Sequence, residues 1–173
     1  MVEFVDLRDI PHVIPTLAKW AENEWGYIRN MGVKYREKVF EGFLGADEAQ
    51  LLICCVAVVE SFFGNGSKHP IGMFVLKESE NNLLNSQNLI EMMYVYVDEP
   101  YRAHGIGALL MQKAMDLAIS MNKGTIVFDT LSPSLNKFYE KFGAKRVGGD
   151  WDNGRLFGEP VTKTSLSPIL VSL

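Results

Sequence analysis

The chain is poor in cysteine and lacks the spacing of side chains that binds metals. Its 173 residues include only two cysteines, Cys54 and Cys55, and these are adjacent. Neighbours in a strand point to opposite faces, so we expect no disulfide between them and interpret both as small core residues. His12 and His69 have no Cys or His partner at ligand spacing, which predicts no metal site. Unpaired thiols are typical of a reducing compartment, and we expect a cytoplasmic protein.

Long apolar runs and a strong net charge are also missing. The longest apolar run, Leu51–Val59, is far shorter than the roughly 20 residues of a membrane-spanning helix. No apolar stretch follows a basic start, so we expect neither a signal peptide nor a membrane protein. The formal net charge is -4 and the pI is about 5.4, with scattered basic residues. A broad basic surface is therefore excluded, and we predict no nucleic-acid partner.

Length and composition are those of one globular domain spanning residues 1–173. The chain is 47% hydrophobic and 22% charged, ordinary values for a soluble protein with a proper core. Apolar spacing predicts helices that start at Asp9 and Tyr35 and end at Gly26 and Gly45. A third helix is predicted at 108–121, and a fourth starts at Pro133 and ends before Gly143. Strands are predicted at 3–7, 51–59, 71–76, 90–97, 125–128, from Val147 onwards and within 157–173.

The order of these elements predicts an α+β fold, an α/β/α sandwich. Gly64–Ser67 is a turn signal that makes 51–59 and 71–76 an antiparallel hairpin, whereas 90–97 and 125–128 enclose a helix as a βαβ unit. We expect a mixed, mostly antiparallel sheet of about six to seven strands, flanked by about four helices.

The most informative stretch is Arg102–Gly107, with the sequence Arg-Ala-His-Gly-Ile-Gly. It follows a predicted strand and precedes a predicted helix, so several backbone N–H groups gather at a helix N-terminus. Such groups favour an anion, for example a phosphate. Gly105 and Gly107 remove the side chains that would keep a pyrophosphate away. The stretch predicts a site for a phosphorylated cofactor.

The loop alone leaves other interpretations open. A dinucleotide-binding loop needs a third small residue where Leu110 stands, and a Walker loop needs a Gly-Lys-Ser/Thr sequence that is absent. A third possible interpretation is a tight turn between strand and helix that binds no ligand.

Two motifs together narrow the choice. Pro100–Leu110 resembles the acyl-coenzyme A loop of the GCN5-related N-acetyltransferase (GNAT) family, with the pattern Arg/Gln-x-x-Gly-x-Gly/Ala. Phe138–Ala144, Phe-Tyr-Glu-Lys-Phe-Gly-Ala, resembles the second landmark of that family at the right interval. The resemblance implies a GNAT-like fold, acetyl-CoA as co-substrate and no metal.

The resemblance also implies which backbone groups hold the cofactor. A bulge would free the amides of the strand before the loop, and these would bind the pantetheine arm like an added strand. The strand residues are Val95, Tyr96 and Val97. The pyrophosphate would be held by the amides of Arg102, Ala103, His104, Gly105, Ile106, Gly107 and Ala108. Arg102 either adds charge or caps the loop, and His104 either contacts a phosphate or is exposed.

Tyr139 is the candidate general acid, because a phenol near the sulfur can protonate the leaving thiolate. Its alternative role is an ordinary helix aromatic. Glu91 falls where some family members carry a catalytic glutamate, and it would relay the proton of the amine as general base. A solvated Glu91 with ordered water as the base is the alternative.

The match departs from the family at the position where an Asn often contacts the pantetheine. Here that residue is Ser132, which either makes a shorter contact or serves only as a helix N-cap. Asn136 is nearby and is a candidate to compensate. Ala144 replaces the usual Phe, a change that we expect to affect packing only.

The resemblance implies an acetyl-CoA-dependent N-acetyltransferase that moves an acetyl group to a primary amine of a small molecule by direct ternary-complex transfer. The alternatives are a protein N-terminal or lysine acetyltransferase that modifies a peptide amine, and an acyl-CoA-binding regulatory domain without turnover. Acidic and aromatic residues would face a cationic acceptor: Trp20, Glu22, Glu24, Trp25, Tyr27, Asp150, Trp151 and Asp152. Core tryptophans and a polar turn at 150–154 are the plainer alternative. The acceptor, the acyl group and the choice between monomer and homodimer stay open.

Overall fold

The computed structural model describes residues 1–46, 52–61, 66–78, 89–130, 133–146, 151–152, 155–156 and 163–166. The chain forms two compact units. The first unit combines Met1–Leu76 with Tyr94–Leu110, and the second combines Lys77–Met93 with Met111–Leu173. Strand β4 (Leu89–Val97) and helix α3 (Ile106–Ser120) each contribute residues to both units.

The first unit contains strands in the order β1-β2-β3-β4. They are β1 (Glu3–Asp6), β2 (Leu52–Glu60), β3 (Lys68–Glu78) and the end of β4. β1 runs antiparallel to β2, with Glu3 opposite Val58. The Ser61 N–H donates to the Ser67 carbonyl at 2.8 Å where β2 turns towards β3. The two strands predicted as a hairpin are therefore neighbours, and β3 extends beyond its predicted bounds at both ends.

The two cysteines lie in the buried middle of β2. Cys54 and Cys55 are free thiols, each 3% exposed. Burial raises the pKa of the Cys54 thiol, because the low-polarity interior disfavours a thiolate. The interpretation of both residues as small core side chains is confirmed.

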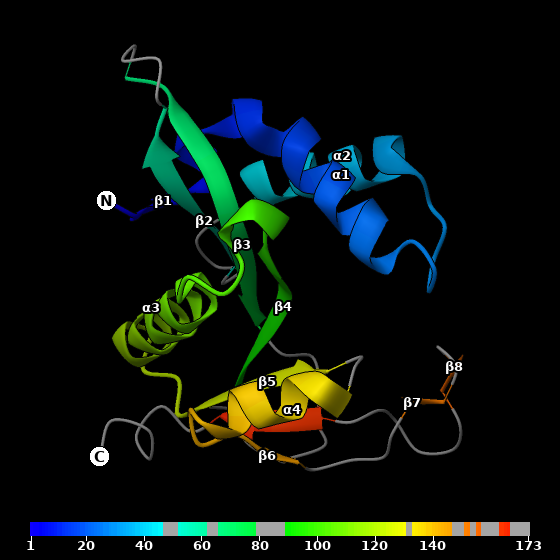
Figure 1. Ribbon diagram of the computed structural model, residues 1–173, viewed down its shortest axis with the longest axis vertical. Helices are drawn as coiled ribbons and strands as arrows, with labels where there is room; N and C mark the ends of the chain where they lie inside the picture. Colours follow the sequence, from blue (N-terminus) through cyan, green and yellow to red (C-terminus); the bar gives the residue numbers. More distant parts are fainter. Residues whose placement is uncertain are drawn as a thin grey trace. The chain divides into compact units, whose positions relative to one another are not determined.

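Two helices of the first unit lie side by side (Figure 1). α1 (Ile14–Trp25) buries Leu17, Ala18 and Ala21, the positions that its apolar spacing singles out. α2 (Val33–Leu44) has Gly45 as its C-cap, as predicted. The predicted start of the first helix is different: the 3-10 helices η1 (Leu7–Asp9) and η2 (Pro11–Val13) precede it.

The second unit contains strands in the order β4-β5-β9-β6. β4 and β5 (Thr125–Asp129) are parallel, with Leu89 opposite Thr125 and Glu91 opposite Val127. α3 connects them, which confirms the βαβ unit. β9 (Lys163–Leu166) runs antiparallel to both β5 and β6 (Lys145–Arg146). α4 (Pro133–Glu140) is followed by Gly143 at φ +84°, the left-handed conformation common after a helix end.

The chain after α4 differs from the prediction. β6 ends at Arg146, one residue before the predicted strand start, and Val147 lies outside the described residues. The short strand β7 (Trp151–Asp152) lies within the range 150–154, for which a polar turn was the alternative, and it pairs antiparallel with β8 (Arg155–Leu156). Ser132 and Asp150 also lie outside the described residues.

The ladders that connect these strands confirm a mixed, mostly antiparallel α+β arrangement with four α-helices in the described part of the chain. None of the helices described is long and apolar enough to span a membrane.

Candidate active site

Strand β4 departs from regular geometry at Tyr94. This residue has φ +52°, whereas strand residues have strongly negative φ values. A left-handed conformation is an outlier for a bulky aromatic residue and persists only where its surroundings hold it. The break comes directly before Val95, the first residue predicted to hold the pantetheine arm. The ladder between β4 and β5 ends earlier, at Glu91 opposite Val127.

The Tyr94 side chain is held within the first unit from two sides. Its ring centre lies 5.4 Å from that of Trp25, edge to face, and 5.4 Å from that of Phe40. Its hydroxyl lies 3.5 Å from Nη1 of Arg36. These contacts supply the surroundings that a strained residue requires.

A glycine on β3 allows the neighbouring strand to approach closely. A Cβ at Gly72 would lie 2.9 Å from the carbonyl oxygen of Tyr96 and 3.3 Å from Cδ1 of Leu110. Any side chain at this position would push β3 away from β4 and from the first turns of α3. Gly72 therefore sets the position of the strand end that leads into the loop.

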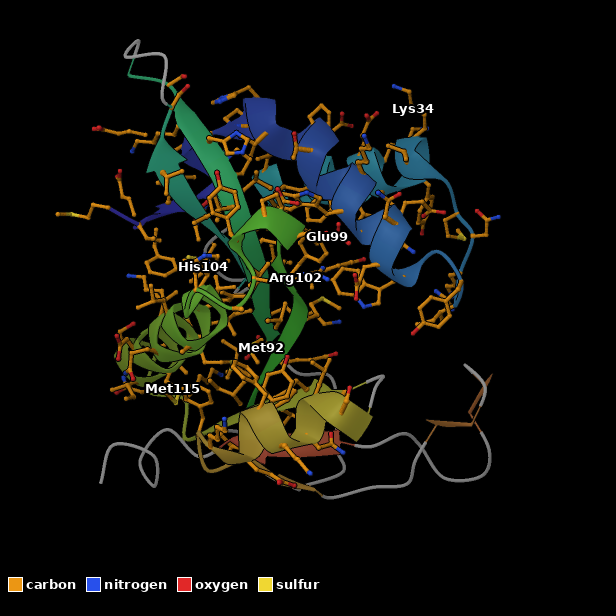
Figure 2. All side chains as sticks on the ribbon, viewed as in Figure 1. Lys34, Met92, Glu99, Arg102, His104 and Met115 are labelled. Carbon is orange, nitrogen blue, oxygen red and sulfur yellow. The ribbon has the colours of Figure 1, made fainter. Side chains whose placement is uncertain are left out.

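The loop itself forms a sharp connection between β4 and α3, where Figure 2 shows Glu99, Arg102 and His104. A carboxylate oxygen of Asp98 accepts a hydrogen bond from the Glu99 N–H at 3.1 Å, which starts the 3-10 helix η4 (Glu99–Tyr101). Ala103 and Gly105 then adopt φ +62° and +81° before α3 begins at Ile106.

This geometry fits the phosphate-binding role predicted for the loop. The first amides of α3 have no acceptor within the helix, and the helix dipole adds positive potential there. A Cβ at Gly105 would meet nothing within 4 Å, so the space beside that residue is open. Glycine at position 105 adopts its left-handed φ without the strain that a side chain would bring.

The Arg102 side chain makes three contacts at the end of β4. Its Nε donates to the Val97 carbonyl at 2.9 Å, and its guanidinium lies 5.2 Å from the centre of the Tyr96 ring. One Nη is 3.5 Å from a carboxylate oxygen of Glu24. The side chain therefore caps the end of β4. His104 is exposed, and its Nδ1 lies 2.7 Å from the Arg102 carbonyl, an acceptor that places the proton on Nδ1.

Tyr139 lies in the second unit, on the last turn of α4, and is 7% exposed. Its ring packs against Phe128 of β5 and against Phe138, with centres 4.5 and 5.1 Å apart. Burial raises the pKa of its hydroxyl to about 12. The phenol is therefore fully protonated at neutral pH, the state that a general acid needs.

The other polar candidates of the second unit have partners inside it. The Thr130 hydroxyl donates to the Asn136 side-chain oxygen at 2.6 Å, and both residues are buried. Lys77 Nζ lies 3.6 Å from a carboxylate oxygen of Glu91, and both side chains are about one third exposed. These contacts leave the cofactor role of Asn136 and the base role of Glu91 as predictions.

The residues predicted to face the acceptor differ in their surroundings. Trp20 is buried, with its ring 5.1 Å from that of Tyr96, and Tyr27 is exposed. Glu22 is different, because its two carboxylate oxygens accept hydrogen bonds from Arg36 Nε at 3.0 Å and from the Gly32 N–H at 3.1 Å. Glu22 therefore offers no free carboxylate to an acceptor, contrary to the prediction. Of Trp151 and Asp152 the structure describes only the backbone strand β7.

A hollow of about 640 Å³ lies in the first unit between α1 and the end of β4. Trp20 and Glu24 line it, as do Asp98 and Glu99, which sequence reasoning did not single out. The only signal for the latter pair was their position just before the glycine loop. Lys19 is a lining residue of opposite charge, so carboxylates outnumber ammonium groups around this hollow.

Several charged side chains around this hollow act on the pKa of the Tyr96 hydroxyl. Burial raises its pKa, Arg102 acts in the opposite direction, and three carboxylates add to the rise: Asp98, Glu24 and Glu99. Burial is thus the largest cause of the raised pKa, and the charges around this phenol act in both directions. A cation in the hollow would be attracted by these carboxylates and by the aromatic rings beside them.

Comparison with known proteins decides the family. The model of the acetyltransferase (GNAT) family matches residues 14–144. The chain belongs to the GNAT family of acetyltransferases. Family members use acetyl-CoA as co-substrate, and within the described residues no three His, Cys, Asp or Glu are grouped as metal ligands. No curated protein matches the chain in sequence.

Solved structures confirm the GNAT fold. An aminoglycoside 6'-N-acetyltransferase complexed with coenzyme A has a TM-score of 0.70 at 17% identity, covering 97% of each chain. A GNAT acetyltransferase from Staphylococcus aureus Mu50 has a TM-score of 0.65 at 16% identity, covering 97% of this chain and 99% of the other. Identities this low show the fold alone.

Proposed function

We propose that this acetyltransferase moves the acetyl group of acetyl-CoA to a primary amine of a small molecule, by direct transfer in a ternary complex. The observation that carries the choice of acceptor is the hollow lined by Glu24, Asp98 and Glu99 beside Tyr96. An amine that is protonated in solution would be attracted to such a lining. We infer one N-acetyltransferase domain over residues 1–173, supported by the family match to 14–144.

The loop between β4 and α3 would hold the pyrophosphate of the co-substrate. Left-handed Gly105 and the free amides at the start of α3 support this role. The amides of Val95, Tyr96 and Val97 would bind the pantetheine arm, a role supported by the break in strand geometry at Tyr94. The thioester of acetyl-CoA supplies the acetyl group, and the chain supplies binding, orientation and proton transfer.

Tyr139 would donate a proton to the departing thiolate sulfur. Its packing against Phe128 supports this role, because the donor has to be an immobile phenol. The phenol is protonated at neutral pH, as an unperturbed tyrosine also is. Glu91, or water that it orders, would accept the proton that the amine loses. For Glu91 itself to act as the base, its carboxylate has either to separate from the Lys77 ammonium group or to accept the proton while it stays next to that group.

Thiol release from acetyl-CoA in the presence of a panel of amines tests the proposal. The panel contains polyamines, amino acids, aminoglycosides and peptides with free N-termini or lysines. Turnover with small cationic amines, at a kcat/KM above that for peptides, is the expected result. Turnover with peptides alone would replace the proposal by a protein acetyltransferase. Binding of coenzyme A without turnover on any amine, unchanged by Tyr139→Phe, would replace it by a regulatory domain.

A further inference from the structure

Arg36 is a buried cation on a helix face that otherwise carries apolar residues. It lies one turn before Phe40 on α2, and it is 7% exposed while Phe40 is fully buried. Burying a guanidinium is costly unless each of its donors finds a partner. In the sequence, the four-residue spacing between Arg36 and Phe40 could have indicated that Arg36 lies on the buried face of the helix.

Its guanidinium contacts three separate segments of the first unit. Nε donates to the Glu22 carboxylate on α1 at 3.0 Å, and Nη2 donates to the Arg29 carbonyl between α1 and α2 at 3.1 Å. Nη1 lies 3.5 Å from the hydroxyl of Tyr94 on β4. The first two contacts tie the helical hairpin together. The third reaches the strand on which the cofactor is expected to lie.

Tyr94 is the residue of β4 that adopts φ +52°. This conformation is unfavourable for tyrosine and needs outside contacts to persist. Trp25 and Phe40 clamp its ring, and Arg36 faces its hydroxyl. The backbone direction of the next three residues, Val95–Val97, depends on this conformation, because one left-handed residue redirects the chain.

We propose that Arg36 is a positioning residue for co-substrate binding: through Tyr94 it holds β4 in the shape that presents the Val95–Val97 amides to acetyl-CoA. The inference rests on the proposed use of these amides. Arg36 itself touches neither substrate in this arrangement. Its fork of donors is what allows simultaneous contact with Glu22, Arg29 and Tyr94, and a single ammonium group could not reproduce it.

The test is the Kd of acetyl-CoA, measured by calorimetry for wild type and for Arg36→Lys. Lysine keeps the charge opposite Glu22 but loses the fork. We expect a roughly tenfold weaker Kd, the effect of giving up about 1.4 kcal/mol of support for a strained residue. Arg8→Lys, at an exposed arginine paired with Asp6, is the matched control and should bind like wild type.

A double-mutant cycle separates positioning from general stability. Glycine adopts a left-handed φ freely, so in a Tyr94→Gly background Arg36→Lys should weaken binding less than about threefold. The inference would be overturned if Arg36→Lys weakened acetyl-CoA binding equally in wild type and in Tyr94→Gly. It would also be overturned if Arg36→Lys lowered the Tm but left the Kd unchanged. Should Arg36→Lys fail to fold, Tyr94→Phe, which removes only the hydroxyl, must weaken the Kd more than Tyr35→Phe does. A wild-type protein that does not bind acetyl-CoA would instead contradict the proposed function.

Discussion

The ring of Tyr139 packs 4.5 Å, centre to centre, from the ring of Phe128 on the neighbouring strand β5. This contact fixes the phenol in a buried place and accounts for its raised pKa, because the interior around it disfavours a phenolate. The two effects together keep a proton on an immobile oxygen throughout the neutral range. Two predictions depend on this arrangement.

Tyr139→Phe should lower kcat by about 10²-fold or more, the usual contribution of a positioned proton donor. The KM of acetyl-CoA should change little, since the ring and its packing remain. Steady-state kinetics with the best amine of the panel checks this. Tyr35→Phe, at an exposed tyrosine of α2, is the control and should keep full activity. An unchanged kcat in Tyr139→Phe would leave Tyr139 as a packing residue.

The same tyrosine should make stability depend on pH in the alkaline range. Its pKa is about 12 in the folded protein and about 10 when unfolded, so its contribution is complete below pH 10. Above pH 10 the unfolded chain loses this proton first, and the contribution disappears as pH rises to about 12. Wild type should therefore lose up to about 3 kcal/mol relative to Tyr139→Phe over this range. Urea unfolding of both proteins between pH 8 and 12 measures the difference. A constant difference would contradict the burial of the hydroxyl.

Gly105→Ala should weaken acetyl-CoA binding through backbone strain. Position 105 has φ +81° and open space around it, so alanine meets no atom but is forced into a left-handed conformation that costs about 1 kcal/mol. The loop will relieve this strain by moving its amides, and the Kd should rise by up to roughly fivefold. Gly45→Ala, also in open space but with φ −94°, is the control. Equal Kd values for both variants would contradict the role of the loop.

Glu99→Gln should weaken binding of a cationic amine without affecting the co-substrate. Glu99 is exposed and lines the hollow, so the loss of its charge should raise the acceptor KM about threefold at low salt. The effect should shrink in 0.5 M salt because of screening, roughly to nothing. Glu41→Gln, at an exposed position of α2, controls for net charge. Should both variants behave alike, the hollow does not bind the acceptor.

Local patterns were sufficient to predict most of the elements of this fold. The apolar spacing of α1 and the glycine after it predicted this helix and its end, although not its start at Ile14, and the two motifs of the loop and α4 identify the family. These signals are local because a helix stripe, a cap or a tight turn is determined by residues a few positions apart. Short strands such as β7 and β8 lack that periodicity and were missed.

Partners distant in sequence could not be predicted in this way. Glu22 looked like an acidic residue for an acceptor, but its partner Arg36 lies 14 positions away on another helix. The family resemblance implied a bulge in β4, but it did not identify Tyr94 as the irregular residue, because an aromatic residue ordinarily favours a regular strand. The packing of Trp25 and Phe40 around its ring, together with Arg36 at its hydroxyl, accounts for the exception.

The close approach at Gly72 has a consequence for the variation that this protein can tolerate. A methyl group there would already meet the Tyr96 carbonyl at 2.9 Å, a backbone atom that cannot rotate away. In a saturation library selected for acetyltransferase activity, position 72 should return glycine alone, whereas the unobstructed Gly42 should accept most amino acids. The evolutionary freedom of β3 is thus limited by a strand that lies beside it rather than by its own propensity.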